Sequence, residues 1–211
     1  MSQMPLIVTH GGTEGTKEHN EGCIEAGRAS SKILAAGGSA LDACVAATVV
    51  LEDDPRLNAG TGSNLRLDGV TLEMDAAVMD HHARFGAVGA IQMVKNPVLV
   101  ARRVMDSPHM LLVGDGAIRF ARTVGVPEHY PISDRALERF AKVKTYLNGD
   151  RSGNWAPNWK TADPAAYWNF PTDLRDALGP SDTVGAVARD AQGGFAAAVS
   201  TGGTSIMILG R

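Results

Sequence analysis

One threonine in this chain stands at a junction where nucleophilic chemistry is possible. Thr183 follows Asp182 and opens a run of small apolar residues, 184–188, where a polar stretch with proline and tryptophan ends. A threonine hydroxyl is a weak nucleophile at neutral pH and needs a base within hydrogen-bond reach. Its own α-amine can be that base once the amine is free. This chemistry requires a cut in the chain immediately before Thr183.

The Asp182-Thr183 bond could be cut by the same threonine. Attack of the Thr183 hydroxyl on the Asp182 carbonyl carbon moves the acyl group from nitrogen to oxygen, and water then hydrolyses the resulting ester. The alternative is that Thr183 is an ordinary β-branched residue at the start of an ordinary strand. Segment 181–188 favours that alternative when it is considered alone, so the rest of the chain has to decide.

The composition indicates a single globular domain. The chain has 211 residues, 44% of them hydrophobic, which is enough for a full core. A net charge of -3 gives no electrostatic reason to expect nucleic acid or an anionic membrane as a partner. No apolar run approaches the roughly 18 residues of a membrane-spanning helix, and the N-terminus does not resemble a signal peptide. We therefore expect a cytoplasmic protein.

The first part of the chain alternates strand and helix patterns. Residues 5–9 form a short strand pattern that runs into His10-Gly11-Gly12, where the glycines allow close backbone approaches. A helix is predicted over residues 20–36, and a second helix with a capping box over 39–51. A loop of breakers and small residues, 53–63, follows.

The middle of the chain continues this alternation. Strands are predicted over 70–79 and 87–94, and a helix with asparagine as N-cap and proline at its first position over 96–106. His81 and His82 lie between the two strands. Metal binding is one interpretation of this pair, but adjacent side chains on a strand point to opposite faces, and no partner set lies at ligand spacing. A solvated turn is the preferred interpretation.

The last part of the chain contains one unusually long connection. Gly114-Asp115-Gly116 matches neither a Walker loop nor the full dinucleotide fingerprint, so it is interpreted as a helix start. A helix is predicted over 133–147, and 148–182 is interpreted as a surface linker that is long for a passive connection. Two strands, 184–189 and 195–200, follow.

The two cysteines, Cys23 and Cys44, lie in helical and largely apolar segments. Structural buried thiols are therefore preferred to a disulfide. The pair supplies no metal site.

Short motifs that run in order along the chain carry a family resemblance. They are His10-Gly11-Gly12, Leu51 to Pro55, Asn58-Ala59-Gly60-x-Gly62-Ser63, Glu73-Met74-Asp75-Ala76, Met79-Asp80, Asn96-Pro97, Thr183 to Ala188, Ser200-Thr201-Gly202-Gly203 and Gly210-Arg211. The set resembles the plant-type L-asparaginase and isoaspartyl peptidase family of N-terminal-nucleophile hydrolases. The resemblance covers nearly the whole chain apart from residues 127–180.

The resemblance implies an α+β fold, an αββα four-layer sandwich that is incomplete at the C-terminus of this chain. It implies one domain over 1–211 that matures by self-cleavage into an α-subunit, 1–182, with its linker at about 148–182, and a β-subunit that starts with 183–211. The expected substrates are asparagine, at its side-chain amide, and β-aspartyl (isoaspartyl) dipeptides. The expected assembly is an (αβ)2 homo-oligomer that includes the missing β-subunit segment.

The resemblance also assigns roles to single residues. Thr183 would be the nucleophile, and Thr201 would hold its hydroxyl by a hydrogen bond. Arg211 would clamp the substrate α-carboxylate, which suits a planar guanidinium. Asn58 would be a donor near the developing oxyanion, and Gly11 would lie in the backbone loop beside the bond that is cut.

No cofactor is expected for catalysis, but the resemblance implies a structural sodium ion. Hard carbonyl oxygens suit such a hard cation. The backbone carbonyls that would bind it belong to Leu51, Glu52, Asp54, Leu57, Ala59 and Thr61.

Two features depart from the pattern of the asparaginase branch. Asp182 stands where that branch usually has glycine, and the Asp-Thr junction also resembles the glycosylasparaginase and taspase branches.

The family continues beyond the position of Arg211 with an aspartate that fixes the substrate amine and a Thr-Gly pair that forms the oxyanion hole. Loss of one oxyanion donor typically lowers the rate by about two to three orders of magnitude. This chain alone is therefore expected to be inactive, as a precursor fragment or, alternatively, a non-catalytic remnant.

Overall fold

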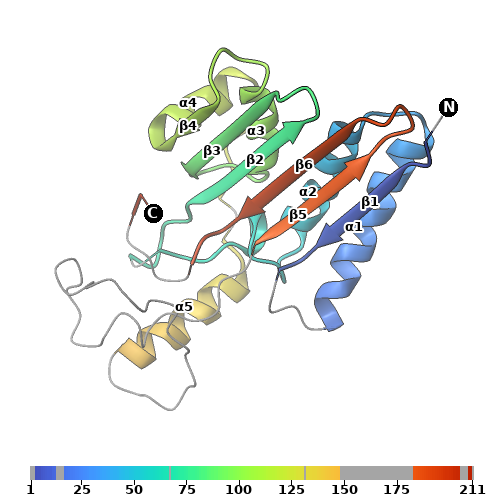
Figure 1. The fold of residues 1–211 in the computed structure, drawn as a ribbon. Helices are drawn as coiled ribbons and strands as arrows, with labels where there is room; N and C mark the ends of the chain where they lie inside the picture. The colour runs from blue at the N-terminus through green and yellow to red at the C-terminus, as the bar shows by residue number, and fades with distance from the viewer. Residues whose placement is uncertain are drawn as a thin grey trace, which may run out of the picture.

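The computed structural model describes residues 3–12, 17–66, 68–130, 132–147, 183–204 and 209–210. These residues form one mixed six-stranded sheet with helices packed against one of its faces (Figure 1). The linker predicted at 148–182, with Asp182 at its end, and Arg211 lie outside the described residues.

The sheet joins strands from both ends of the chain. Its order is β1-β5-β6-β2-β3-β4, and every pair is antiparallel except β3 and β4. The strands are β1 (Leu6–His10), β2 (Met74–Asp80), β3 (Phe85–Ile91), β4 (Leu111–Val113), β5 (Val184–Arg189) and β6 (Phe195–Thr201). The prediction that the strand after Thr183 lies beside the strand near residues 5–9 is confirmed, because β1 and β5 are neighbours.

The helices follow the predicted pattern closely. Helices α1, α2 and α3 contact the sheet along the strands, and α4 packs beside β3 and β4 (Figure 1). The helices are α1 (Lys17–Ala35), α2 (Ala40–Asp53), α3 (Pro97–Val104), α4 (Gly114–Thr123) and α5 (Asp134–Leu147), with a short 3-10 turn at Gly60–Gly62.

Small side chains let the helices approach the sheet closely. On β5 and β6 the residues that face the helices are mostly alanine, such as Ala186, Ala188 and Ala198, each at most 2% exposed. At Gly86 on β3 an added Cβ would run into the backbone of α3 at Ala101. At these contacts the helices and the sheet are therefore held together by close packing of small groups.

The opposite face of the sheet is open in the described residues. Val8 is 60% exposed, Val187 52% and Phe195 52%, and each alternates along its strand with less exposed neighbours. The expected combination of helices and a mixed sheet in one α+β fold is thus confirmed at this coarse level. The second sheet and the second helical layer of the predicted sandwich remain predictions, because the described residues contain a single sheet.

Capping was predicted correctly at one helix and incorrectly at another. At α2 the Ser39 side chain accepts a hydrogen bond from Asp42 N at 3.1 Å. At α3, Asn96 occupies the N-cap position, but its side chain makes no capping bond. The side-chain Oε1 of Glu52 accepts from Val98 N instead, at 3.0 Å. A buried acid from the end of α2 has therefore replaced the expected local cap.

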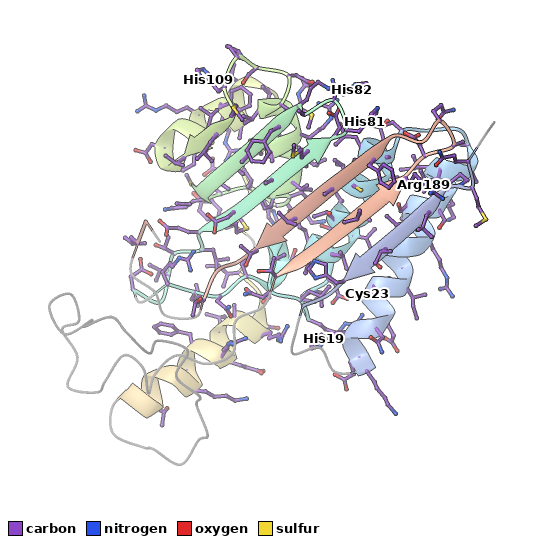
Figure 2. All side chains as sticks on the ribbon, viewed as in Figure 1. His19, Cys23, His81, His82, His109 and Arg189 are labelled. Carbon is purple, nitrogen blue, oxygen red and sulfur yellow. The ribbon has the colours of Figure 1, made fainter. Side chains whose placement is uncertain are left out.

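The remaining predictions for these segments can be checked directly. His81 and His82 lie in the exposed turn between β2 and β3, where Figure 2 labels them. Cys23 and Cys44 are both free thiols, and burial raises the pKa of Cys44 to about 12. None of the described helices is long and apolar enough to cross a membrane. The strand β4 was missed by the sequence analysis.

Candidate active site

The strand register brings the two predicted catalytic threonines together. Val184 on β5 is paired with Ser200 on β6 in antiparallel register. One further step along both strands puts Thr183 opposite Thr201. Side chains alternate along a strand, so both threonines belong to the open face, with the exposed Val187 and Val199. Directly opposite residues of an antiparallel pair have Cβ atoms about 4.5–5.5 Å apart, which is a distance that hydroxyl groups can bridge.

A third polar residue, an aspartate, lies beside Thr201 on the next strand of the sheet. Asp75 on β2 is the register partner of Thr201. Its Oδ1 accepts a hydrogen bond from Ala90 N at 2.9 Å. Ala90 has φ +48, which is uncommon for a residue with a side chain, and it lies beside an irregularity in the β2–β3 pairing. Asp75 belongs to one of the sequence motifs, but no role was predicted for it. Only the strand register shows that it lies beside Thr201.

The end of β1 lies on the other side of Thr183. His10 is paired with Gly185, and a Cβ added to Gly185 would contact His10 Nε2, so the imidazole covers this glycine. Gly11 follows His10, and a Cβ added there would come within 3.0 Å of Cys23 Sγ. The structure thus brings Gly11 to the strand that neighbours Thr183, as the predicted role requires.

Asn58 is tied to the glycine loop that follows Thr201. Its backbone oxygen accepts from Gly202 N at 2.9 Å, and its Nδ2 donates to Gly203 O at 2.8 Å. Asn64 Nδ2 donates to the same carbonyl at 2.9 Å. Gly203 N in turn donates to Thr201 Oγ1 at 3.1 Å. The buried Asn58 therefore acts on the loop that holds the Thr201 hydroxyl, and one of its two amide hydrogens is already bonded there.

Close packing explains the first glycine of this loop. A Cβ on Gly202 would overlap the Cα of Ser63 and lie 2.5 Å from Asn58 Oδ1. The 202–203 segment therefore sits directly on the 58–63 loop, and any side chain at 202 would separate the two. Arg66, which sequence reasoning did not single out, is fully buried beside the same segment.

The loop predicted to bind sodium is compact and rich in inward-facing carbonyl groups. A Cβ on Gly60 would contact Glu52 O, and a Cβ on Gly62 would overlap Leu57 O. The carbonyl oxygens of Asp54, Leu57 and Ala59 each accept one backbone hydrogen bond, and a carbonyl oxygen has a second lone pair. These residues fit an uncharged oxygen site for a monovalent cation. Among the described residues, no group of three or more histidine, cysteine or acidic side chains could hold a metal ion.

One strongly perturbed acid lies beneath the site. Glu52 is fully buried, and burial raises the pKa of its carboxyl group to about 8. Its bond from Val98 N acts in the opposite direction but does not overcome the loss of water. Burial therefore favours the neutral form of this carboxyl group, which accepts the hydrogen bond at the start of α3.

The structure places Thr183, Thr201, Asn58 and Gly11 near one another, while Asp182 and Arg211 lie outside the described residues. Gly210, the residue before Arg211, is described, and its N donates to Glu73 Oε2 at 2.8 Å. The roles assigned to these residues stay predictions, since proximity alone does not show which groups take part in a reaction.

Comparison with known proteins supplies independent information. A sequence model of the family described as Asparaginase matches residues 4–211. The chain is 41% identical to the plant-type L-asparaginase of Pyrococcus horikoshii over an alignment of 216 residues. The alignment covers 99% of the chain and 66% of that protein. It is 39% identical to the isoaspartyl peptidase/L-asparaginase of Danio rerio and 38% identical to that of Homo sapiens, and it covers 63% of each. The chain thus spans 63–66% of the length of these relatives.

Proposed function

The chain belongs to the asparaginase family, and we propose that the protein is a threonine amidohydrolase that acts on L-asparagine, on β-aspartyl dipeptides or on both. One observation carries the proposal beyond the family name. Thr183 stands at the start of the inner strand β5, in register with Thr201 on β6. A nucleophile and a second hydroxyl that can orient it are thereby brought to one face of a rigid sheet.

Activation would begin with self-cleavage. The Thr183 hydroxyl attacks the Asp182 carbonyl carbon, the C–N bond breaks as the ester forms, and water hydrolyses the ester. The products are a new carboxylate at Asp182 and a free α-amine on Thr183. The position of Gly11, directly after the end of β1, whose last residue His10 pairs with Gly185, supports a role for the His10-Gly11 loop next to the bond that is cut.

The free amine would then act as the general base. A free α-amine has a reference pKa of about 7.7–8.0, close enough to neutral pH to accept the hydroxyl proton. Thr201, whose oxygen accepts from Gly203 N, would hold the Thr183 hydroxyl by a hydrogen bond. The hydroxyl of Thr183 attacks the substrate carbonyl carbon, ammonia or an amine leaves with the transferred proton, and water releases aspartate from the acyl-enzyme.

Two further side chains would bind the substrate. Arg211 would hold the α-carboxylate, and the side-chain amide of Asn58, which also bonds Gly203 O, would donate to the oxyanion. The burial of Asn58 supports this role, because a donor fixed in a site shielded from water needs no reorganisation during the reaction.

We also propose the finer features of the family for this protein. A structural sodium ion would bind the carbonyls of the 51–61 loop, with no part in the chemistry; their inward packing supports this. A second sheet would cover the open face and complete an αββα sandwich. The contiguous apolar residues of that face support this, since single domains rarely expose such surfaces. The mature protein would be a cytoplasmic (αβ)2 homo-oligomer.

The Asp182-Thr183 junction favours a second candidate, a glycosylasparaginase-like or taspase-like specificity. Three substrates distinguish the candidates: L-asparagine, a β-aspartyl dipeptide and an N-glycosylated asparagine. Preference for the glycosylated amide would transfer the assignment to that branch.

The full-length gene product tests the proposal as a whole. Intact mass spectrometry should find a fragment that begins at Thr183, and hydrolysis of a β-aspartyl dipeptide should appear in parallel with that fragment. A chain that stays whole and hydrolyses neither amide would instead be a non-catalytic remnant.

A further inference from the structure

A buried ion pair lies behind the glycine loop of the candidate site. Arg66 has the largest side chain among the described residues that are completely buried. Its Nε lies 3.2 Å from Glu73 Oε2, and the two side chains are 0% and 5% exposed. Removing two charges from water is so costly that apolar residues of similar size often stabilise a fold equally well or better. Such a pair is therefore weak evidence for stability and directs attention to what it holds.

Arg66 divides its donors between two segments. Its Nη2 donates to the backbone oxygen of Glu73 at 2.8 Å, at the start of β2. Its Nη1 donates to Thr204 O at 3.2 Å and more weakly to Gly202 O at 3.5 Å. A Cβ on Gly203, whose φ is +70, would come within 2.7 Å of the same Nη1. The guanidinium thus lies flat against the loop that follows Thr201.

Glu73 joins a third segment to the pair. Its Oε2 accepts both from Arg66 Nε and from Gly210 N, the latter at 2.8 Å. Its Oε1 is 3.4 Å from Gln92 Nε2 on the segment after β3. One carboxylate therefore fixes the backbone amide of Gly210, the residue before Arg211 in the sequence.

We propose that Arg66 and Glu73 are positioning residues for the reaction, an inference that rests on the proposed function. Arg66 fixes the carbonyls on both sides of Gly203 and so fixes the direction of Gly203 N. That N–H is the donor that holds Thr201 Oγ1. Glu73 keeps Arg66 in place and separately anchors Gly210, and with it the backbone that leads into Arg211.

The two residues have separable effects because they hold different segments. Disturbing Arg66 misdirects Thr201 and slows the chemical step, whereas disturbing Glu73 also displaces the backbone next to Arg211 and weakens substrate binding. A lysine at 66 keeps the positive charge but replaces the rigid fork with one point charge, so it cannot bond the loop and Glu73 in the same geometry. A glutamine at 73 keeps the shape and loses the charge.

The test uses Arg66→Lys and Glu73→Gln in the full-length protein, with the cleaved fraction measured by intact mass. Per cleaved molecule, Arg66→Lys should lower kcat for a β-aspartyl dipeptide about 10- to 100-fold, with KM changed less than about threefold. Glu73→Gln should raise KM about tenfold in addition to lowering kcat. Val104→Ala, in the buried part of α3, is the control for loss of stability alone.

The outcomes separate this inference from the proposed function. If the wild-type protein is cleaved and active, and both variants lower Tm like Val104→Ala while kcat and KM stay at wild-type values, the pair is structural and the inference is wrong. If Arg66→Lys does not fold, Glu73→Gln alone decides by its KM. If the wild-type protein is neither cleaved nor active, the proposed function fails, and the inference fails with it.

Discussion

The two ends of the sheet both bury polar side chains but use them for different purposes. At the turn end, where the β2–β3 and β5–β6 hairpins close, Asp80 and Asp190 bond backbone N–H groups two and four residues further along the chain. Asp190 has one long-range bond in addition, from Ala40 N. At the site end, where β5 begins and β6 terminates, Asn58, Asn64 and Arg66 bond carbonyls that lie 136 to 145 positions away. Figure 2 labels His81, His82 and Arg189 at the turn end, and Cys23 near the site end.

This difference indicates what each set of bonds is for. A turn is closed most economically by a side chain within the turn itself, and the benefit appears as stability. Long-range bonds to one short glycine loop fix a geometry that local sequence cannot fix. We therefore expect changes at the site end to alter rates more than stability, and changes at the turn end to do the reverse.

The largest effect is expected at Thr183. Thr183→Ala removes the nucleophile, so self-cleavage should stop and hydrolysis of a β-aspartyl dipeptide should fall by at least about 10^4-fold. Because Thr183 is exposed, the Tm should change little. Thr183→Ser keeps the hydroxyl and should retain part of both activities.

Thr123→Ala on α4 is a matched control for this change. That threonine is exposed, and its hydroxyl bonds only the preceding helical turn, at Arg119 O. It should leave cleavage and hydrolysis unchanged. Unimpaired hydrolysis by Thr183→Ala would show that the nucleophile has been assigned to the wrong residue.

A smaller effect is expected at Thr201. Thr201→Val is nearly isosteric and removes the group that receives the Gly203 N–H bond and can orient Thr183. The kcat should fall about 10^2-fold with the fold intact. The measurement is kcat on the cleaved protein, together with Tm. A large loss of Tm at unchanged kcat would place Thr201 with the structural residues and break the contrast between the two ends.

Asp190 tests the contrast from the other direction. Although burial opposes its ionisation, the N–H groups of Ala40, Gln192 and Gly194 hold the pKa of Asp190 below its usual range. Asp190→Asn should cost about 1–3 kcal/mol of unfolding free energy at pH 7 and leave kcat unchanged.

The pH dependence of this loss has a defined sign. A folded-state pKa below the unfolded value means that the carboxylate stabilises the protein above the unfolded pKa and loses that contribution as pH falls. The difference in unfolding free energy between wild type and Asp190→Asn should therefore narrow as pH falls below 4. A difference that stays constant down to the acid transition would contradict the assignment of the charged form.

The regular elements were predictable because local signals agree with the fold. The small-residue helix α2 has its cap at Ser39, and β5 and β6 alternate apolar residues with a glycine turn between them, so pattern and packing give the same answer. The strand β4 was missed because its three residues carry too short a pattern, and its pairing with β3 is parallel and non-local.

The site was predictable only where a motif marks it. Thr183 and Thr201 stood out by resemblance, and the register then brought them together. Arg66 was not singled out, and Glu73 was quoted only within a motif of a predicted strand, because the burial of both depends on segments more than a hundred residues away in the sequence. Glu52 was considered only for its carbonyl, since no local pattern shows that its carboxyl group caps α3.

At Glu52 the expected effect is confined to the pH dependence of stability, and it refines the contrast because this buried acid favours its neutral form in the folded protein. Burial raises the pKa of its carboxyl group to about 8, whereas the unfolded chain has the ordinary value of 4.5. Between these values the folded state binds the proton that the unfolded state releases, so this group lowers stability as pH rises from 5 to 8.

Glu52→Gln keeps the acceptor for Val98 N and cannot ionise. The unfolding free energy of Glu52→Gln minus that of the wild type should therefore rise by at most about 1.4 kcal/mol per pH unit, measured by urea denaturation at pH 5, 6, 7 and 8. Asp42→Asn, an exposed carboxylate in the first turn of the same helix, is the control and should show no such trend. A difference between Glu52→Gln and wild type that does not change with pH would mean that Glu52 is already ionised in the fold.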